Sequence, residues 1–177
     1  FQFLRKKNAT PAPQSIYDQL GGEAAVRAMA ERFYDVMETN PKAKDLLALH
    51  PQPLTMIRQK FFEFLSGWFG GPPLFEEQYG HPRLRARHMP FRIDIRMRDQ
   101  WLLCMYQVLD EQVSDPLLKM QLRQRFTQLA HHMINTDKVL QANPGGASNP
   151  DTNAPQGCLV QAHSRIPNEL TVASHEN

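Results

Sequence analysis

The sequence predicts an all-α fold, and three observations carry this prediction. Apolar residues recur at intervals of three and four along every long segment between residues 15 and 138. Residues typical of helix starts and stops bound these segments, and no segment alternates apolar and polar residues as a strand does. The chain of 177 residues is therefore expected to hold one helical domain over 15–138. An N-terminal extension (1–14) precedes it, and a C-terminal tail (139–177), whose Asn-, Pro- and Ser-rich composition predicts disorder, follows it.

The first half of the predicted domain contains helices with clear boundaries. Ser15 begins a short helix through a capping pattern, and the glycine pair that starts at Gly21 ends it. A long helix over 23–38 follows, and an Asn-Pro pair stops it. A short helical turn over 42–48 and a proline-bounded loop complete this half of the domain.

The second half begins with a helix over 55–69 that is apolar on more than one face. Such a helix is expected to contact more than one neighbour. Residues 74–92 are predicted to form a loop with one short helical piece, in which Pro82 suits the first turn. Helices over 94–113 and 115–135 complete the domain, because each begins with an aspartate that can cap its first turn.

Composition excludes several classes of protein. The formal net charge is only +2, which argues against a dedicated nucleic-acid binder. The apolar runs are far shorter than a membrane span, and the apolar residues at the N-terminus precede the basic ones, the reverse of a signal peptide. The two cysteines, Cys104 and Cys158, form neither a zinc motif nor a disulfide framework, so a reducing cytoplasm is the expected location.

The stretch GHPRLRARHMPFRI, residues 80–93, carries two histidines, His81 and His88, among several arginines. One neutral imidazole is enough to hold haem iron from one side. Haem would also need an apolar slot between helices and cations for its two propionates. The candidate slot residues are Phe33, Phe61, Leu65, Trp68, Phe69, Met89 and Phe91, and the candidate propionate partners are Arg85, Arg87 and Arg92. Ordinary core packing and a solvated loop would explain the same residues, so neither group is specific alone.

The order of several segments along the chain is more specific. These segments are FY at 33–34, LHP at 49–51, FLSGWFGGP at 64–72, GHPRLRARHMPFRI at 80–93 and RDQWLLCM at 98–105. Together they resemble the group II truncated haemoglobins over about residues 15–136. The resemblance implies a shortened globin in which two helices pack over two others around haem b.

The resemblance also implies roles for single residues. His88 matches the proximal histidine that binds the iron, whereas His81 matches no ligand and is expected to shape the turn before it. Tyr34 and Trp101 match the distal tyrosine and tryptophan, whose O–H and N–H groups donate hydrogen bonds to the bound ligand.

Three further residues complete the distal side that the resemblance implies. His50, matched through the proline that follows it, would be a third polar group beside the ligand. Phe61 would stand where conventional globins carry a distal histidine, and Leu65 would stand one turn further on. An apolar gate is therefore expected in place of the usual distal histidine.

A polar distal pocket has a consequence for ligand release. Bound dioxygen carries partial negative charge, and each well-aimed donor stabilises it by roughly 1–3 kcal/mol. Two or three such bonds would slow release by about ten- to several-thousand-fold. The sequence therefore predicts redox chemistry on O₂, NO or peroxide, or ligand sensing, more than bulk oxygen transport. CO is a further expected ligand, a reductase an expected partner, and the state a monomer or a homodimer. NO dioxygenase and peroxidase-like activities both stay open.

An alternative function uses the same basic segment without haem. The arginines between Arg83 and Arg98 could make a helical module that binds an anion or nucleic acid. Such binding would weaken steeply with salt. The low net charge and the short basic span argue against this alternative.

Overall fold

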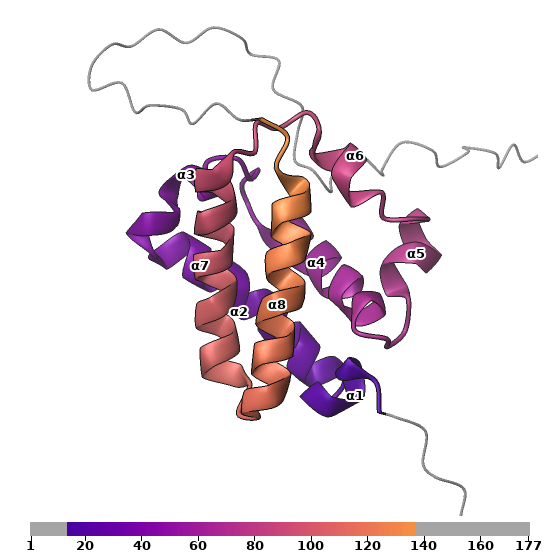
Figure 1. The fold of residues 1–177 in the computed structure, drawn as a ribbon. Helices are drawn as coiled ribbons and strands as arrows, with labels where there is room; N and C mark the ends of the chain where they lie inside the picture. The colour runs from indigo at the N-terminus through magenta and orange to yellow at the C-terminus, as the bar shows by residue number, and fades with distance from the viewer. Residues whose placement is uncertain (1–13, 137–177) are drawn as a thin grey trace, which may run out of the picture.

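The computed structural model describes residues 14–136, and every regular element within them is a helix (Figure 1). The elements in chain order are α1 (Ile16–Leu20), α2 (Glu23–Thr39), the 3₁₀ turn η1 (Pro41–Ala43), α3 (Lys44–Leu47), α4 (Thr55–Trp68), α5 (Leu74–Tyr79), α6 (Leu84–His88), α7 (Ile95–Gln112) and α8 (Pro116–Met133). The predicted all-α fold is confirmed. The C-terminal tail and most of the N-terminal extension lie outside the described residues.

Side-chain caps begin several of these helices at the residues that the sequence predicts. The Ser15 hydroxyl accepts a hydrogen bond from the amide of Asp18 at 3.0 Å. The Asp94 carboxylate accepts from the amide of Met97 at 2.9 Å, and Asp115 accepts from the first amides of α8. These bonds satisfy amide groups that have no partner inside the helix, which is why the chain turns helical at these points.

The segment over 74–92 differs from the prediction of one short helical piece, because it contains both α5 and α6. Pro82 lies before α6 and not in its first turn. The reason is a local turn in which the His81 ring accepts a hydrogen bond from the amide of Arg83 at 3.1 Å. Arg83 adopts a left-handed backbone with φ 43°, so the helix begins only at Leu84. The expected role of His81 in shaping the turn agrees with this geometry.

The long helices form two layers. The pair α7 and α8 runs side by side and crosses α2 behind it, and α2 packs on both α4 and α7 (Figure 1). The space between the layers is filled by side chains that are less than 2% exposed, including Phe33, Phe62, Leu65, Met105, Leu122 and Phe126. Burial of such side chains supplies most of the stabilisation, about 1.5–3 kcal/mol each. By contrast, α6 buries no residue fully.

Residues 14–136 contain no helix that could span a membrane. None of the helices there combines the length and the hydropathy that a bilayer crossing requires.

Candidate functional site

One cavity lies between the two layers, and residues of α6 and of the segment that follows it form part of its lining. Six predicted site residues line it, namely Tyr34, His50, Phe61, His88, Phe91 and Trp101. The rest of the lining comes from Leu46, Leu49, Ile57, Phe64, Leu84, Ile93, Met97, Arg98, Leu129, Ala130 and Met133. The structure thus brings together residues from α2, α4, α6 and α7 that are far apart in the sequence. A mostly apolar cavity with a few polar groups is typical of a cofactor site.

His88 ends the short helix α6 and is held by that helix itself. Its Nδ1 lies 2.7 Å from the carbonyl oxygen of Leu84, one turn earlier. A carbonyl can only accept, so Nδ1 carries the proton and Nε2 keeps its lone pair. Burial lowers the pKa of His88, against a smaller opposing effect of the Leu84 carbonyl. His88 is therefore a neutral imidazole with a nitrogen that can bind a metal ion.

Aromatic rings form the opposite wall of the cavity. The ring centroids of Tyr34 and Phe61 are 5.8 Å apart, and those of Phe61 and Trp101 are 6.5 Å apart. Phe33 lies behind them, 5.0 Å from Phe61 and 5.2 Å from Trp101. These edge and tilted contacts fix the ring orientations. The hydroxyl and indole groups are therefore presented by a rigid wall.

A charged cluster ties α4 to α2 beside Tyr34. Arg58 donates to the carboxylate of Asp35 at 2.8 Å and to that of Glu38 at 2.6 Å. It also donates to the carbonyl oxygen of Glu31 at 2.7 Å, and its guanidinium carbon lies 5.7 Å from the centroid of the Tyr34 ring. The cluster holds the start of α4, which follows the proline-rich loop, next to the tyrosine.

His50, which the sequence predicts as a third polar group beside the ligand, lines the cavity, and its ring is anchored to α3. Its Nδ1 lies 2.9 Å from the carbonyl oxygen of Leu46, so this nitrogen carries the proton in the neutral ring. Burial is the main cause that lowers the pKa of His50, and the positive charge of a protonated His88 would lower it further. At neutral pH the remaining Nε2 is consequently a hydrogen-bond acceptor, and the ring faces Tyr34 at a centroid distance of 5.8 Å.

Eight of the predicted cofactor-contact residues do not line the cavity. They are Phe33, Leu65, Trp68, Phe69, Arg85, Arg87, Met89 and Arg92. The four on α2 and α4 or directly after α4 pack in the core, where Trp68 and Phe69 contact Phe126 at 4.7 and 6.0 Å between ring centroids. Because α4 is apolar on more than one face, its period could not show which face meets the cavity. That face carries Ile57, Phe61 and Phe64.

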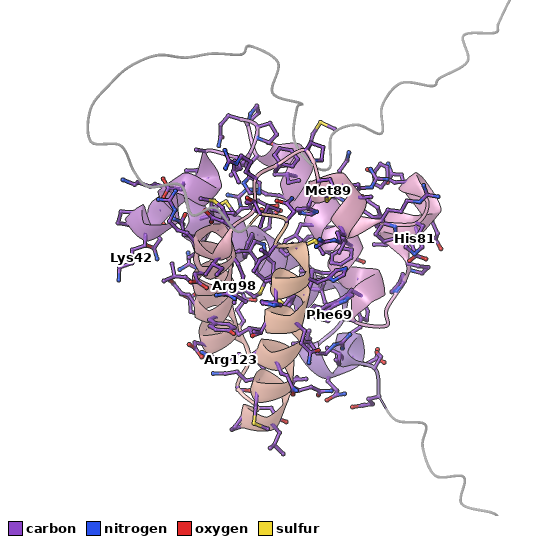
Figure 2. The ribbon with its side chains drawn as sticks, turned by 45° about the horizontal axis from the view of Figure 1, so that its top comes forward. Lys42, Phe69, His81, Met89, Arg98 and Arg123 are labelled. Carbon is purple, nitrogen blue, oxygen red and sulfur yellow. The ribbon has the colours of Figure 1, made fainter. Side chains whose placement is uncertain are left out.

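The other four residues lie at the surface or bind elsewhere. Arg87 donates to the carbonyl oxygen of Pro82 at 2.8 Å. Met89 is 57% exposed (Figure 2), and Arg92 is also exposed. Arg85 donates to the carbonyl oxygens of His132 and Ile134. The cation that does line the cavity is Arg98 on α7 (Figure 2), which sequence reasoning assigned only to the basic segment.

Lys60 is a buried cation near α6 that the sequence did not reveal as a candidate site residue. Lys60 on α4 is 1% exposed, and its Nζ has no hydrogen-bond partner among the described residues. The nitrogen lies 4.8 Å from the centroid of the Tyr79 ring. Burial lowers the pKa of Lys60, and the charge of Arg87 lowers it further, whereas Glu63 raises it. Burial of the ammonium is costly, and the buried carboxylate of Glu63, whose Oε2 also has no hydrogen-bond partner among the described residues, offsets part of that cost.

These features together satisfy the requirements of haem. The cavity supplies an apolar body, one imidazole with an available lone pair and one lining cation, Arg98. Two further cations, the buried Lys60 and the half-buried Arg87, lie outside its lining, next to or on the helix that carries the imidazole. An apolar macrocycle with two carboxylates and one iron ion matches this set of groups. The residues present therefore fit the group that the resemblance implies.

Comparison with known proteins gives the same answer. Residues 15–135 match the family model of the bacterial-like globins. The group 2 truncated hemoglobin YjbI of Bacillus subtilis is 36% identical over 114 residues, which cover 64% of this chain and 84% of that protein.

Solved structures are similar as well. A cold-adapted truncated hemoglobin from Pseudoalteromonas haloplanktis TAC125 is 58% identical with a TM-score of 0.69, over 70% of this chain and 99% of that one. A group II 2-on-2 hemoglobin from Agrobacterium tumefaciens is 38% identical with a TM-score of 0.69, over 72% and 98%. The chain therefore belongs to the bacterial-like globin family, as a group II truncated haemoglobin with haem b as its cofactor.

Proposed function

We propose that this protein uses haem b to retain a diatomic ligand and to carry out redox chemistry on O₂, NO or peroxide, or to sense such a ligand. The observation that carries the proposal is the shared cavity of His88, Tyr34 and Trp101. The iron, when haem is bound, supplies the attachment point for the ligand. CO would bind at the same point.

On the side of α6, Nε2 of His88 is the nitrogen that would bind the iron. The Leu84 carbonyl fixes the orientation and the tautomer of the ring through Nδ1. Such a bond to the second nitrogen also makes an imidazole a better ligand. Lys60 and Arg87 would hold the propionates, in place of Arg85 and Arg92 of the sequence prediction.

On the aromatic side, Tyr34 and Trp101 would donate hydrogen bonds to the ligand. Both residues line the cavity, and Tyr34 is only 3% exposed. Donors in a site with little water stabilise developing negative charge more strongly than donors in water do. His50, as a neutral acceptor, would orient the tyrosine hydroxyl and not contact the ligand as a third donor.

Strong retention favours chemistry or sensing over transport, because a carrier must release its ligand. Stopped-flow spectroscopy can decide between the reactions. The oxygenated protein is mixed with NO, and in a parallel experiment the ferric protein is mixed with hydrogen peroxide. A fast, stoichiometric reaction with either would identify the chemistry, whereas slow reactions with both would leave sensing as the function.

The nucleic-acid alternative has no support. Several arginines of the basic segment have partners within the protein, such as Arg85 with the end of α8, Arg87 with the carbonyl oxygen of Pro82 and Arg98 with Asp99. We place the protein in the cytoplasm, where a reductase would return the iron to the ferrous state. The buried thiol of Cys104 is not in a disulfide, and burial raises its pKa to about 11, in line with a reducing compartment and an inert cysteine.

A further inference from the structure

Helix α6 has few apolar contacts to hold it. It has five residues, none of them fully buried, and Met89 directly after it is 57% exposed. The helix nevertheless carries both His88 and the Leu84 carbonyl that orients the imidazole. The ring and its partner lie in one turn of the same helix. Whatever positions α6 therefore positions the imidazole in the cavity.

Asn135, which follows α8, forms a set of hydrogen bonds with the end of α6 and the segment after it. Its Nδ2 donates to the carbonyl oxygen of His88 at 3.1 Å and to that of Phe91 at 2.8 Å. Its Oδ1 accepts from the amide of Ile93 at 3.0 Å. The amide of Asn135 donates to the carbonyl oxygen of Ile93 at 3.0 Å. Both side-chain polar atoms are thus used on one short stretch around the histidine.

Arg85 makes the opposite connection, from α6 to the end of α8. Its Nη1 donates to the carbonyl oxygens of His132 and Ile134. Carbonyl groups in the last turn of a helix have no partner inside the helix, so a cation there is favourable. Arg85 thus satisfies carbonyl groups at the end of α8, and Asn135 satisfies the His88 carbonyl at the end of α6.

We propose that Arg85 and Asn135 form a reciprocal latch that positions α6 against the end of α8 and so sets the place of the His88 imidazole in the cavity. Both are positioning residues, since neither lines the cavity. The proposal rests on the proposed role of His88 as the iron ligand. A purely local capping role would affect stability but would leave the imidazole where it is.

The test uses the haem-loaded protein with the variants Asn135→Leu and Arg85→Met. The first removes all side-chain hydrogen bonds that Asn135 makes, at similar volume. The second changes an exposed side chain, so it tests the latch even where Asn135→Leu does not fold. Two quantities are measured: the iron–histidine stretching band of the ferrous protein by resonance Raman spectroscopy, and the rate of haem transfer to excess apomyoglobin.

Gln100→Leu is the matched control. Gln100 on α7 also makes two half-buried bonds through its amide, to the amide of Leu46 at 2.9 Å and to Asp45 at 3.0 Å. It connects α7 to α3. Both variants lose a half-buried amide, which makes three hydrogen bonds in Asn135 and two in Gln100, but only the bonds of Asn135 reach α6.

We expect Asn135→Leu to shift the iron–histidine band and to speed haem transfer by about tenfold, as loss of an outer contact to a metal ligand does. Arg85→Met should act in the same direction by about threefold, because one side-chain nitrogen serves both carbonyls. Gln100→Leu should leave the band unchanged. An unshifted band in Asn135→Leu and Arg85→Met, or an equal shift in Gln100→Leu, would overturn the latch. His88→Ala distinguishes failure of the latch from failure of the proposed function. If this variant keeps its haem, His88 is not the iron ligand, and the latch proposal fails with that assignment.

Discussion

The two walls of the cavity are built from different interactions. Tyr34, Phe61 and Trp101, the distal wall, come from three long helices and are fixed by ring contacts inside the core. The proximal wall is α6, a helix of five residues. It is held mainly by hydrogen bonds to Asn135, directly after α8. Apolar contacts are many and non-directional, whereas hydrogen bonds are few and directional. A single polar substitution should therefore disturb the proximal wall far more than the distal wall.

The largest expected effect comes from the proximal wall. His88→Ala should abolish or severely weaken haem retention, because no other group is in place to bind the iron from α6. His81→Ala is the control, since His81 lies in the same basic stretch and serves the turn before α6. Soret absorbance per protein after reconstitution with haemin measures the difference. Equal absorbance in the two variants would contradict the assignment of the ligand.

A change behind the distal wall should act mainly on folding. Phe126 on α8 is fully buried, and its ring lies 5.7 Å from that of Trp101. Phe126→Ala should lower the free energy of unfolding by about 3–5 kcal/mol, because it leaves a cavity in a packed core. Urea unfolding of the haem-free protein measures this loss. A loss below about 1 kcal/mol would mean that the wall is not held by packing as described.

Lys60→Met should act on the haem-loaded protein more than on the haem-free protein. In the haem-free protein, relief from the cost of burying the ammonium is offset by the lost attraction to the buried carboxylate of Glu63, so the free energy of unfolding should change by less than about 1 kcal/mol. The same change should speed haem loss by about tenfold, because a charge-assisted bond to a propionate is removed. Lys119→Met, at an ion pair with Asp110 far from the cavity, should change neither quantity by much. Faster haem loss in the control, or none in Lys60→Met, would remove Lys60 from the site.

The smallest expected effect is a pH dependence from the distal wall. Burial lowers the pKa of His50 in the folded protein, so the unfolded chain, with a pKa of about 6.5, binds the proton more tightly. The stabilisation is therefore complete above about pH 6.5 and is lost as the pH falls through the lowered pKa. Urea unfolding of the haem-free protein between pH 5 and 8 should show this decrease, and His50→Gln should make it shallower. An unchanged slope would show that His50 titrates as it does in water.

The sequence predicted the elements well where local chemistry decides them. Asp94 and Asp115 lie before their helices because an aspartate can satisfy the first amides, whatever the rest of the fold does. The different places of His81 and His88 could also be predicted, because the resemblance assigns the role of iron ligand to His88 and none to His81. Both depend on residues that are near each other in the chain.

Residues brought together by packing were harder to predict. Leu65 and Ile57 are both buried apolar residues of α4, and only the tertiary packing of that helix decides that Ile57 lines the cavity and Leu65 does not. The charge of the arginines suggested that they bind the haem propionates. Arg85 instead donates hydrogen bonds to carbonyl oxygens at the end of α8. The contribution of Asn135 is invisible in the sequence, because its partners are main-chain atoms more than forty residues away.

The central claim is that a ligand held by the iron of haem meets hydrogen-bond donors from a rigid distal wall. Stopped-flow measurement of oxygen release from the wild type, Tyr34→Phe, Trp101→Phe and the double variant tests it most directly. We expect each single change to speed release by about five- to hundredfold, and the double variant to be faster than either, because each donor contributes about 1–3 kcal/mol. Release rates equal to that of the wild type in both single variants would contradict the account.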